Sequence, residues 1–188
     1  MRDIVAVEFV SVDGVVESPE KWTGPYFDDE IGQAMQAGMD ASDAMLLGRR
    51  TYEEFAAYWP DKTAEDDPYA DYINATQKFV VSTTLKSVDW RNSTLVTGDV
   101  AKELTRLKQQ PGKNITIVGS PSLMRSLLRD GLLDRLELLV FPVVVGGGKR
   151  LFEEGIGELP LELVDSRAYK TGVVSLAYSV SRTGGRPG

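Results

Sequence analysis

Short apolar runs alternate along the first two thirds of the chain with segments in which apolar residues recur every three or four positions. Runs of this kind, bounded by polar turns, are typical of buried strands, whereas the second spacing predicts helices. The predicted strands are 3–10, 43–48, 78–82, 94–97 and 114–118. The predicted helices are 28–39, 51–58, 69–75, 100–109 and 121–130. This alternation predicts a mainly parallel sheet with helices on both faces.

The last third of the chain has a different pattern. Long strand patterns cover 133–145, 161–170 and 173–181, and Thr171-Gly172 forms a tight-turn candidate between the last two. Strands joined by a tight turn run antiparallel, so the sheet is predicted to be mixed. The fold class is therefore α/β, a three-layer α/β/α arrangement. We expect one domain over 1–181 and a disordered tail over 182–188, which lacks apolar side chains.

The absence of cysteine and histidine limits the catalytic mechanisms that this chain can use. The chain contains neither cysteine nor histidine, which excludes disulfides, thiol nucleophiles, imidazole catalysis and zinc sites of the usual ligand types. No metal site is expected. Hydride transfer fits what remains, because a nicotinamide cofactor carries the reactive hydrogen and the protein orients the rings and excludes water.

Net charge and hydropathy argue against nucleic acid and membranes as binding partners. The formal net charge is -7, whereas non-specific binding to nucleic acid or to a membrane surface normally requires a basic face. No apolar run approaches the roughly 20 residues needed to span a bilayer, and the first residues resemble a strand and not a signal peptide. We therefore expect a cytoplasmic protein that binds neither nucleic acid nor membranes.

Three predicted strands end in small hydroxyl or glycine residues where a helix is expected to begin. The turns are Gly48-Arg49-Arg50-Thr51, Ser82-Thr83-Thr84 and Gly119-Ser120-Pro121-Ser122-Leu123. A helix N-terminus offers unpaired N–H groups and the positive end of its dipole, which suits a phosphate. Helix capping is the commonest alternative use of these residue types. Three such turns at one sheet edge favour a dinucleotide.

Two arginines follow Gly48 directly. A guanidinium in the first helical turn is opposed by the helix dipole, so Arg49 and Arg50 indicate a compensating anion. A ribose 2'-phosphate would serve, which favours NADPH over NADH. The alternative is that both arginines are surface charges balanced by Glu53 and Glu54.

A second group of residues lies between the first strand and the following helix. The acidic candidates there are Asp13, Asp28 and Asp29. Isolated carboxylates are more often caps or solvated charges, but Trp22 and Phe27 lie in the same segment and could cover a flat heterocycle. We therefore predict Asp13 and Asp28 as catalytic residues, and Trp22, Phe27 and the more distant Trp59 as substrate-binding residues, in a pocket between this strand and this helix.

A glycine triplet, Gly146-Gly147-Gly148, precedes Lys149. It matches neither the phosphate loop of nucleotide hydrolases, where Ser or Thr should replace Arg150, nor the dinucleotide fingerprint G-x-G-x-x-G. A structural turn and a ligand-facing loop both remain open.

In their order and spacing, four segments resemble the dihydrofolate reductase fold, and more closely its riboflavin-biosynthesis branch, the RibD C-terminal domains. The segments are Ser11-Val12-Asp13-Gly14, Leu47 to Glu53, Val118 to Leu123 and Pro142 to Gly147. The resemblance implies NADPH as cofactor and a homodimer. By this likeness the adenosine phosphates would be held by Gly48, Arg49, Arg50 and Thr51, the 2'-phosphate by Ser82 and Thr83, and the pyrophosphate by Gly119, Ser120, Pro121, Ser122 and Leu123.

These observations together predict a stand-alone NADPH-dependent reductase of a small flat heterocycle, such as a pterin or a pyrimidine. Two alternatives from other classes are a non-catalytic nucleotide- or ligand-binding module on the same fold and a structural dimer whose turns only cap helices.

Overall fold

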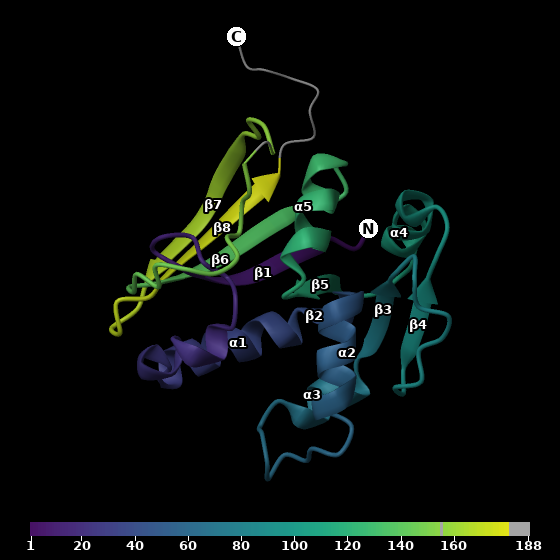
Figure 1. Ribbon diagram of the computed structural model, residues 1–188, viewed down its shortest axis with the longest axis horizontal. Coiled ribbons are helices and arrows are strands. Elements are labelled where there is room, and N and C mark those ends of the chain that lie inside the picture. The colour runs from purple at the N-terminus through teal and green to yellow at the C-terminus, as the bar shows by residue number, and fades with distance from the viewer. Residues whose placement is uncertain (155, 181–188) are drawn as a thin grey trace.

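The computed structural model describes residues 1–154 and 156–180, and the predicted tail 182–188 lies outside them. Within these residues the strands form one sheet in the order β4-β3-β2-β5-β1-β6-β8-β7 (Figure 1). The strands are β1 (Ile4–Ser11), β2 (Ser42–Gly48), β3 (Gln77–Val81), β4 (Ser93–Val96), β5 (Asn114–Val118), β6 (Arg135–Phe141), β7 (Leu161–Ala168) and β8 (Val174–Val180). The strands from β4 to β6 pair in parallel, whereas β8 pairs antiparallel with both of its neighbours, β6 and β7. The predicted mixed sheet is confirmed.

Five α-helices in the described part of the chain complete the three layers. They are α1 (Asp29–Asp40), α2 (Arg49–Tyr58), α3 (Ala70–Ala75), α4 (Val100–Gln109) and α5 (Pro121–Arg129), with short 3-10 helices at Pro19–Lys21 and Gly24–Tyr26. Apolar side chains of α4 and α5 pack on one face of the sheet, and those of α1, α2 and α3 pack on the other. Among the described residues, no helix has the length and apolar character needed to cross a membrane.

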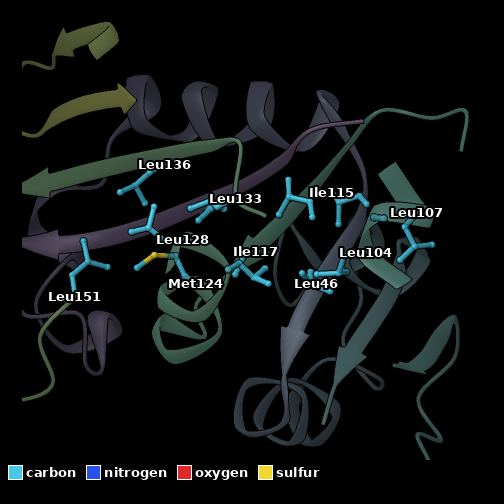
Figure 2. Packing of buried hydrophobic residues seen from close by; sticks show 14 of the residues in the cluster. Leu46, Leu104, Leu107, Ile115, Ile117, Met124, Leu128, Leu133, Leu136 and Leu151 are labelled. Carbon is cyan, nitrogen blue, oxygen red and sulfur yellow. The ribbon is translucent and has the colours of Figure 1, made fainter. Parts of the chain in front are cut away.

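The larger part of the core lies beneath α4 and α5 (Figure 2). Alternate residues of the strands enter it: Ile4 and Ala6 of β1 belong to the same cluster as Met124 and Leu128 of α5. Figure 2 labels the last two. Full burial of a leucine or isoleucine side chain contributes about 1.5–3 kcal/mol. The opposite face is divided between a cluster around Phe141 beneath α1 and another around Met45 and Leu47 beneath α2.

The segment after β3 differs from the prediction. No helix begins at Ser82; an irregular segment over 82–92 leads into β4. The Ser82 hydroxyl accepts hydrogen bonds from the backbone N–H groups of Thr84 and Leu85, at 3.1 and 3.0 Å, and so closes a local turn. Serine side chains that bond nearby backbone groups in this way compete with helix formation.

Candidate functional site

The carboxyl ends of β2 and β5 are neighbours in the sheet, and each strand leads directly into a helix. The two helices, α2 and α5, lie on opposite faces, yet their N-termini meet at this edge (Figure 1). Ser120 joins them: its hydroxyl accepts a hydrogen bond from the Gly48 N–H at 2.9 Å and donates to the Thr51 hydroxyl at 2.7 Å. The first and third predicted turns therefore form one continuous surface.

Neither helix start is capped by its own N-cap side chain. Gly48 and Ser120 occupy the N-cap positions of α2 and α5, and neither makes a side-chain cap hydrogen bond. By contrast, Asp28 and Asp99 cap α1 and α4 in the usual way. Helix N–H groups without a capping oxygen, together with the dipole, are suited to bind an anion.

Close backbone approach explains the glycines at this edge. A Cβ atom on Gly48 would lie 3.2 Å from the Ser120 hydroxyl oxygen, which is tighter than ordinary contact. Gly119 has a φ of +60°, a conformation that side-chain-bearing residues adopt at a cost. Both positions thus keep the backbone bare where the two turns face each other.

The two arginines of α2 have different surroundings. Arg49 forms an ion pair with Glu53 at 3.2 Å, one turn later, as the surface-charge alternative predicted. Arg50 is exposed, lines the cavity described below and makes no ion pair with any described residue. Of the two, Arg50 has the guanidinium free to meet an anion.

Ser82 and Thr83 require correction as cofactor-binding residues. Neither lines the cavity that contains the other two turns. Ser82 is buried with its hydroxyl engaged in the turn after β3, and Thr83 is exposed. The missing helix removes the N-terminus that was to bind the phosphate.

A cavity of about 1200 Å³ opens from the paired helix starts onto the face of the sheet that α1 covers. It exceeds the roughly 300–1,000 Å³ of most small-molecule sites and is suited to a dinucleotide with a second ring. Its apolar walls come from β1, β6 and α1, with Val7, Phe9, Leu139, Ala34 and Met35. Trp59 lines it together with Phe55 and Tyr58, which agrees with its predicted position in the pocket.

The far part of the cavity is polar. Arg135 and Glu137 of β6 form an ion pair at 3.0 Å, and Asn114 and Thr116 of β5 line the same cavity. Burial raises the pKa of Glu137, and the positive charge of Arg135 partly opposes that rise. This pair offers charged hydrogen-bonding groups beside the apolar walls of the cavity.

Asp13 requires correction as a catalytic residue. Its carboxylate accepts hydrogen bonds from the Ser11 hydroxyl at 2.6 Å and from the N–H groups of Val145 and Gly146 at 3.0 and 2.9 Å. These bonds, led by that of Ser11, lower its pKa to about 2. Asp13 does not line the cavity. It fastens the glycine-rich loop to the end of β1, which supports the structural-turn interpretation of that loop.

Asp28, predicted as catalytic, and Trp22 and Phe27, predicted as substrate-binding, also do not line the cavity. Asp28 caps α1 by accepting a hydrogen bond from the Ile31 N–H at 3.0 Å. Trp22 and Phe27 pack on Phe141, with ring centroids 5.7 and 6.2 Å from it. The aromatic cluster therefore belongs to the apolar cluster beneath α1, and only Trp59 of the three predicted aromatic residues lines the cavity.

Sequence reasoning missed Glu8. It lies in the middle of β1, is 3% exposed and lines the cavity. Burial raises its pKa to about 8, although the positive charge of Arg125 acts in the opposite direction. The signal was present in the sequence, because Glu8 is the one charged residue in the apolar run Ile4–Val10.

The sequence and the fold agree with a known family. The model of the RibD C-terminal domain family matches residues 2–175. The chain belongs to the RibD C-terminal domain family. The chain is similar to YyaP of Bacillus subtilis (strain 168), itself uncharacterized. The two are 28% identical over 183 residues, which is 94% of each chain.

Solved structures of other proteins share the fold of this RibD C-terminal domain. A candidate riboflavin biosynthesis protein from Shewanella sp. PV-4 is similar with a TM-score of 0.78 and 21% identity, over 96% of this chain and 99% of that one. Dihydrofolate reductase from Enterococcus faecalis, in complex with NADP(H), has a TM-score of 0.63 and 12% identity, over 96% and 97% of the two chains. The predicted dihydrofolate reductase-like architecture is confirmed.

Proposed function

We propose that this protein is an NADPH-dependent reductase of a small flat heterocycle. The observation that carries the proposal is the pair of uncapped helix starts, joined by Ser120, that opens into a large cavity with aromatic and apolar walls. Family membership and the NADP(H) complex of the similar Enterococcus faecalis enzyme support it.

The residues at the sheet edge fit the cofactor. The N–H groups at the starts of α2 and α5 would hold its phosphates, the bare backbone at Gly48 and Gly119 allows them to approach, and Arg50 would meet the 2'-phosphate. When bound, NADPH would supply the hydride. The apolar walls, with Phe9 and Leu139, would exclude water from the reacting rings.

The chamber beyond fits a flat ring with a polar edge. Trp59 and Phe55 offer aromatic surface, and aromatic contacts contribute about 0.5–1.5 kcal/mol beyond their buried area. The Arg135–Glu137 pair would hydrogen-bond the ring nitrogens and exocyclic groups of such a substrate. We therefore assign recognition of the heterocycle to β6 and α2, and not to Asp13 or Asp28.

Calorimetry with NADPH and NADH tests the proposal. We expect NADPH to bind at least about tenfold more tightly, a difference of about 1.4 kcal/mol. Arg50→Ala should remove most of this preference, whereas Arg129→Ala, an exposed arginine at the other end of α5, should preserve it. Equal dissociation constants for the two cofactors would contradict the proposal. Tight binding without turnover in a screen of pterins, pyrimidines and related rings would favour a non-catalytic module.

A further inference from the structure

The sheet divides beside Glu8. Pairing between β1 and β5 runs from Ile4↔Ile115 to Val7↔Val118 and ends there, whereas pairing between β1 and β6 continues to Ser11↔Phe141. Glu8 is therefore the first residue of β1 beyond the end of β5. Next to it the chain turns away through Gly119 into the start of α5, where the cofactor phosphates are proposed to bind.

The side chain of Glu8 lies on the α5 side of the sheet, because Ala6 and Val10, two positions away on each side, pack in the core with Met124 and Leu127. The cavity reaches this side as well, since Val16 and Leu123, which pack against the same core, also line it. Its carboxyl oxygen Oε1 is buried and has no hydrogen-bond partner in the described part of the chain. A buried polar atom without a partner costs about 1–3 kcal/mol. The residue nevertheless lines the cavity, so its unpartnered carboxyl group lies beside the space that a ligand would fill.

Few charges face this carboxyl group. Arg125 of α5 is the charge that acts on it, but this guanidinium donates to the carbonyl oxygens of Arg150 and Leu151 and pairs with Glu153 at 2.6 Å. On the side of β6 the paired residue is Leu138, which is apolar. On the side of the loop after β1, Val16 is apolar and the neighbouring Glu17 pairs with Lys149 at 3.7 Å. Burial dominates over Arg125, and the carboxyl group is held in its protonated form at neutral pH.

The other acids of the cavity are less suited to donate a proton. Glu17 pairs with Lys149 at 3.7 Å, and Glu137, whose pKa burial also raises, pairs with Arg135 at 3.0 Å, so each carboxyl group already has a charged partner. Glu20 and Glu54 are exposed. Of the acids that line the described cavity, Glu8 alone is both buried and without an ion pair.

We propose that Glu8 is the proton donor of the reduction. The inference rests on the proposed function. A C=N bond of the heterocycle would gain a hydride from NADPH at carbon and the Glu8 proton at nitrogen, leaving NADP⁺ and the Glu8 carboxylate. This carboxylate would then balance the positive charge of the oxidised nicotinamide ring and would regain its proton from solvent.

The first test needs no ligand. The protein is labelled with ¹³C at the glutamate carboxyl carbons, and its resonances are followed against pH by NMR. We expect one resonance to titrate near pH 8; it should be absent in Glu8→Gln and present in the matched control Glu162→Gln, an exposed position on β7. A Glu8 resonance that titrates near the ordinary value of 4.5 would overturn the proposal.

The second test uses cofactor binding. Calorimetry at pH 7 in buffers of different ionisation enthalpy counts the protons released. NADP⁺ should release up to about one proton more than NADPH, because both carry the same phosphates and only the oxidised ring is positive. Glu8→Gln should abolish this difference, and Glu162→Gln should retain it. An undiminished difference in Glu8→Gln would overturn the proposal.

The third test uses turnover of a heterocycle found in the screen. Glu8→Gln should lower kcat by about 10²–10⁴-fold with little change in KM, and the alkaline fall of kcat should disappear. Glu8→Asp keeps a carboxyl group on a shorter side chain and should recover part of the rate. With the ¹³C label placed at the aspartate carboxyl carbons, it should also show a titrating resonance that wild type lacks, even if Glu8→Gln folds poorly. Unchanged kcat in a folded Glu8→Gln would refute the role of Glu8 but preserve the proposed reductase. Failure of both cofactor forms to bind, with the Glu8 titration intact, would refute the reductase and this role with it.

Discussion

At the scale of single residues, burial gives Glu8 properties that its side chain lacks in water. The carboxyl group sits among apolar side chains of β1, β6 and α5, and its pKa rises from 4.5 to about 8. The folded protein therefore binds this proton more tightly than the unfolded chain does. Stability from Glu8 is fully present below about pH 4.5 and is lost progressively as the pH rises toward 8.

Glu8→Gln is expected to change how stability depends on pH. Relative to wild type, this neutral variant should gain on the order of 3 kcal/mol in free energy of unfolding between pH 4.5 and pH 7, because each pH unit in this window costs the wild type about 1.4 kcal/mol. Urea denaturation at both pH values measures this gain. A stability difference between the two proteins that is the same at both pH values would show that Glu8 is ionised in the folded protein.

Gly119→Val is expected to abolish NADPH binding in a folded protein. A side chain there would stand where the backbone must approach the pyrophosphate, and the φ of +60° adds about 1–2 kcal/mol of strain. Gly98→Val is the matched control, since Gly98 has a φ of +75° with open space around it and does not line the cavity. Calorimetry of both variants, checked for folding by circular dichroism, separates strain from binding. If both bind NADPH normally, the third turn has only a structural role.

At the scale of elements, the two aspartates predicted to be catalytic fix the ends of secondary structure. Asp28 starts α1, and Asp13 joins the end of β1 to the loop after β6. Both act through backbone N–H groups, and neither lines the cavity. Their variants should therefore alter stability or local motion and leave hydride transfer intact.

Asp28→Ala is expected to destabilise the protein by about 1 kcal/mol, the usual effect of removing an N-cap oxygen. Asp28→Asn should be nearly neutral, because asparagine accepts the same hydrogen bond from the Ile31 N–H. Thermal denaturation measures both, and NADPH oxidation measures activity. A large loss of activity in a stable Asp28→Asn would restore Asp28 as a catalytic candidate.

Asp13→Asn should loosen the glycine-rich loop. The amide side chain can accept fewer hydrogen bonds than the carboxylate that now receives the N–H groups of Val145 and Gly146. Amide hydrogen exchange at these two residues should accelerate, while exchange at Ile31, beside the other cap, serves as the reference. Unchanged protection at Val145 and Gly146 would mean that other contacts hold the loop.

The sequence predicted the helices and strands more reliably than the positions and contacts of individual side chains. Helix 100–109 and strand 114–118 agree with α4 and β5, because caps and apolar spacing are local properties. The turns at Gly48 and Gly119 were found for the same reason. Ser82 was misjudged because a hydroxyl serves a local turn as readily as a helix start, and Glu8 was overlooked because burial of a carboxyl group depends on strands that are distant in sequence.

At the scale of the whole molecule, the candidate cofactor site joins both outer layers. The helices α2 and α5 pack on opposite faces of the sheet and touch at Ser120. A ligand across both helix starts would therefore add a further link between the two layers, beside the hydrogen bonds of Ser120.

NADPH is accordingly expected to stabilise the entire fold. At a free concentration of 100 times the dissociation constant, binding to the folded state alone adds about 2.7 kcal/mol to the free energy of unfolding. Thermal denaturation followed separately through α-helical signal and tryptophan fluorescence should shift by the same amount for both probes. A shift seen by only one probe would indicate that the two layers unfold independently.

The early end of β5 creates a sheet edge inside the protein. Past Val7, β1 has no partner strand on its β5 side, so the backbone groups of Glu8 and Phe9 on that side are not paired with β5 where these residues line the cavity. A backbone group is the same whichever residue carries it, so contacts made here persist through substitutions that would erase a side-chain contact. The two ends of the cavity are thus free to diverge at different rates. Phe9, Trp59 and Glu137 can be exchanged to suit a new substrate. The unpaired edge of β1 remains as long as β5 ends at Val118.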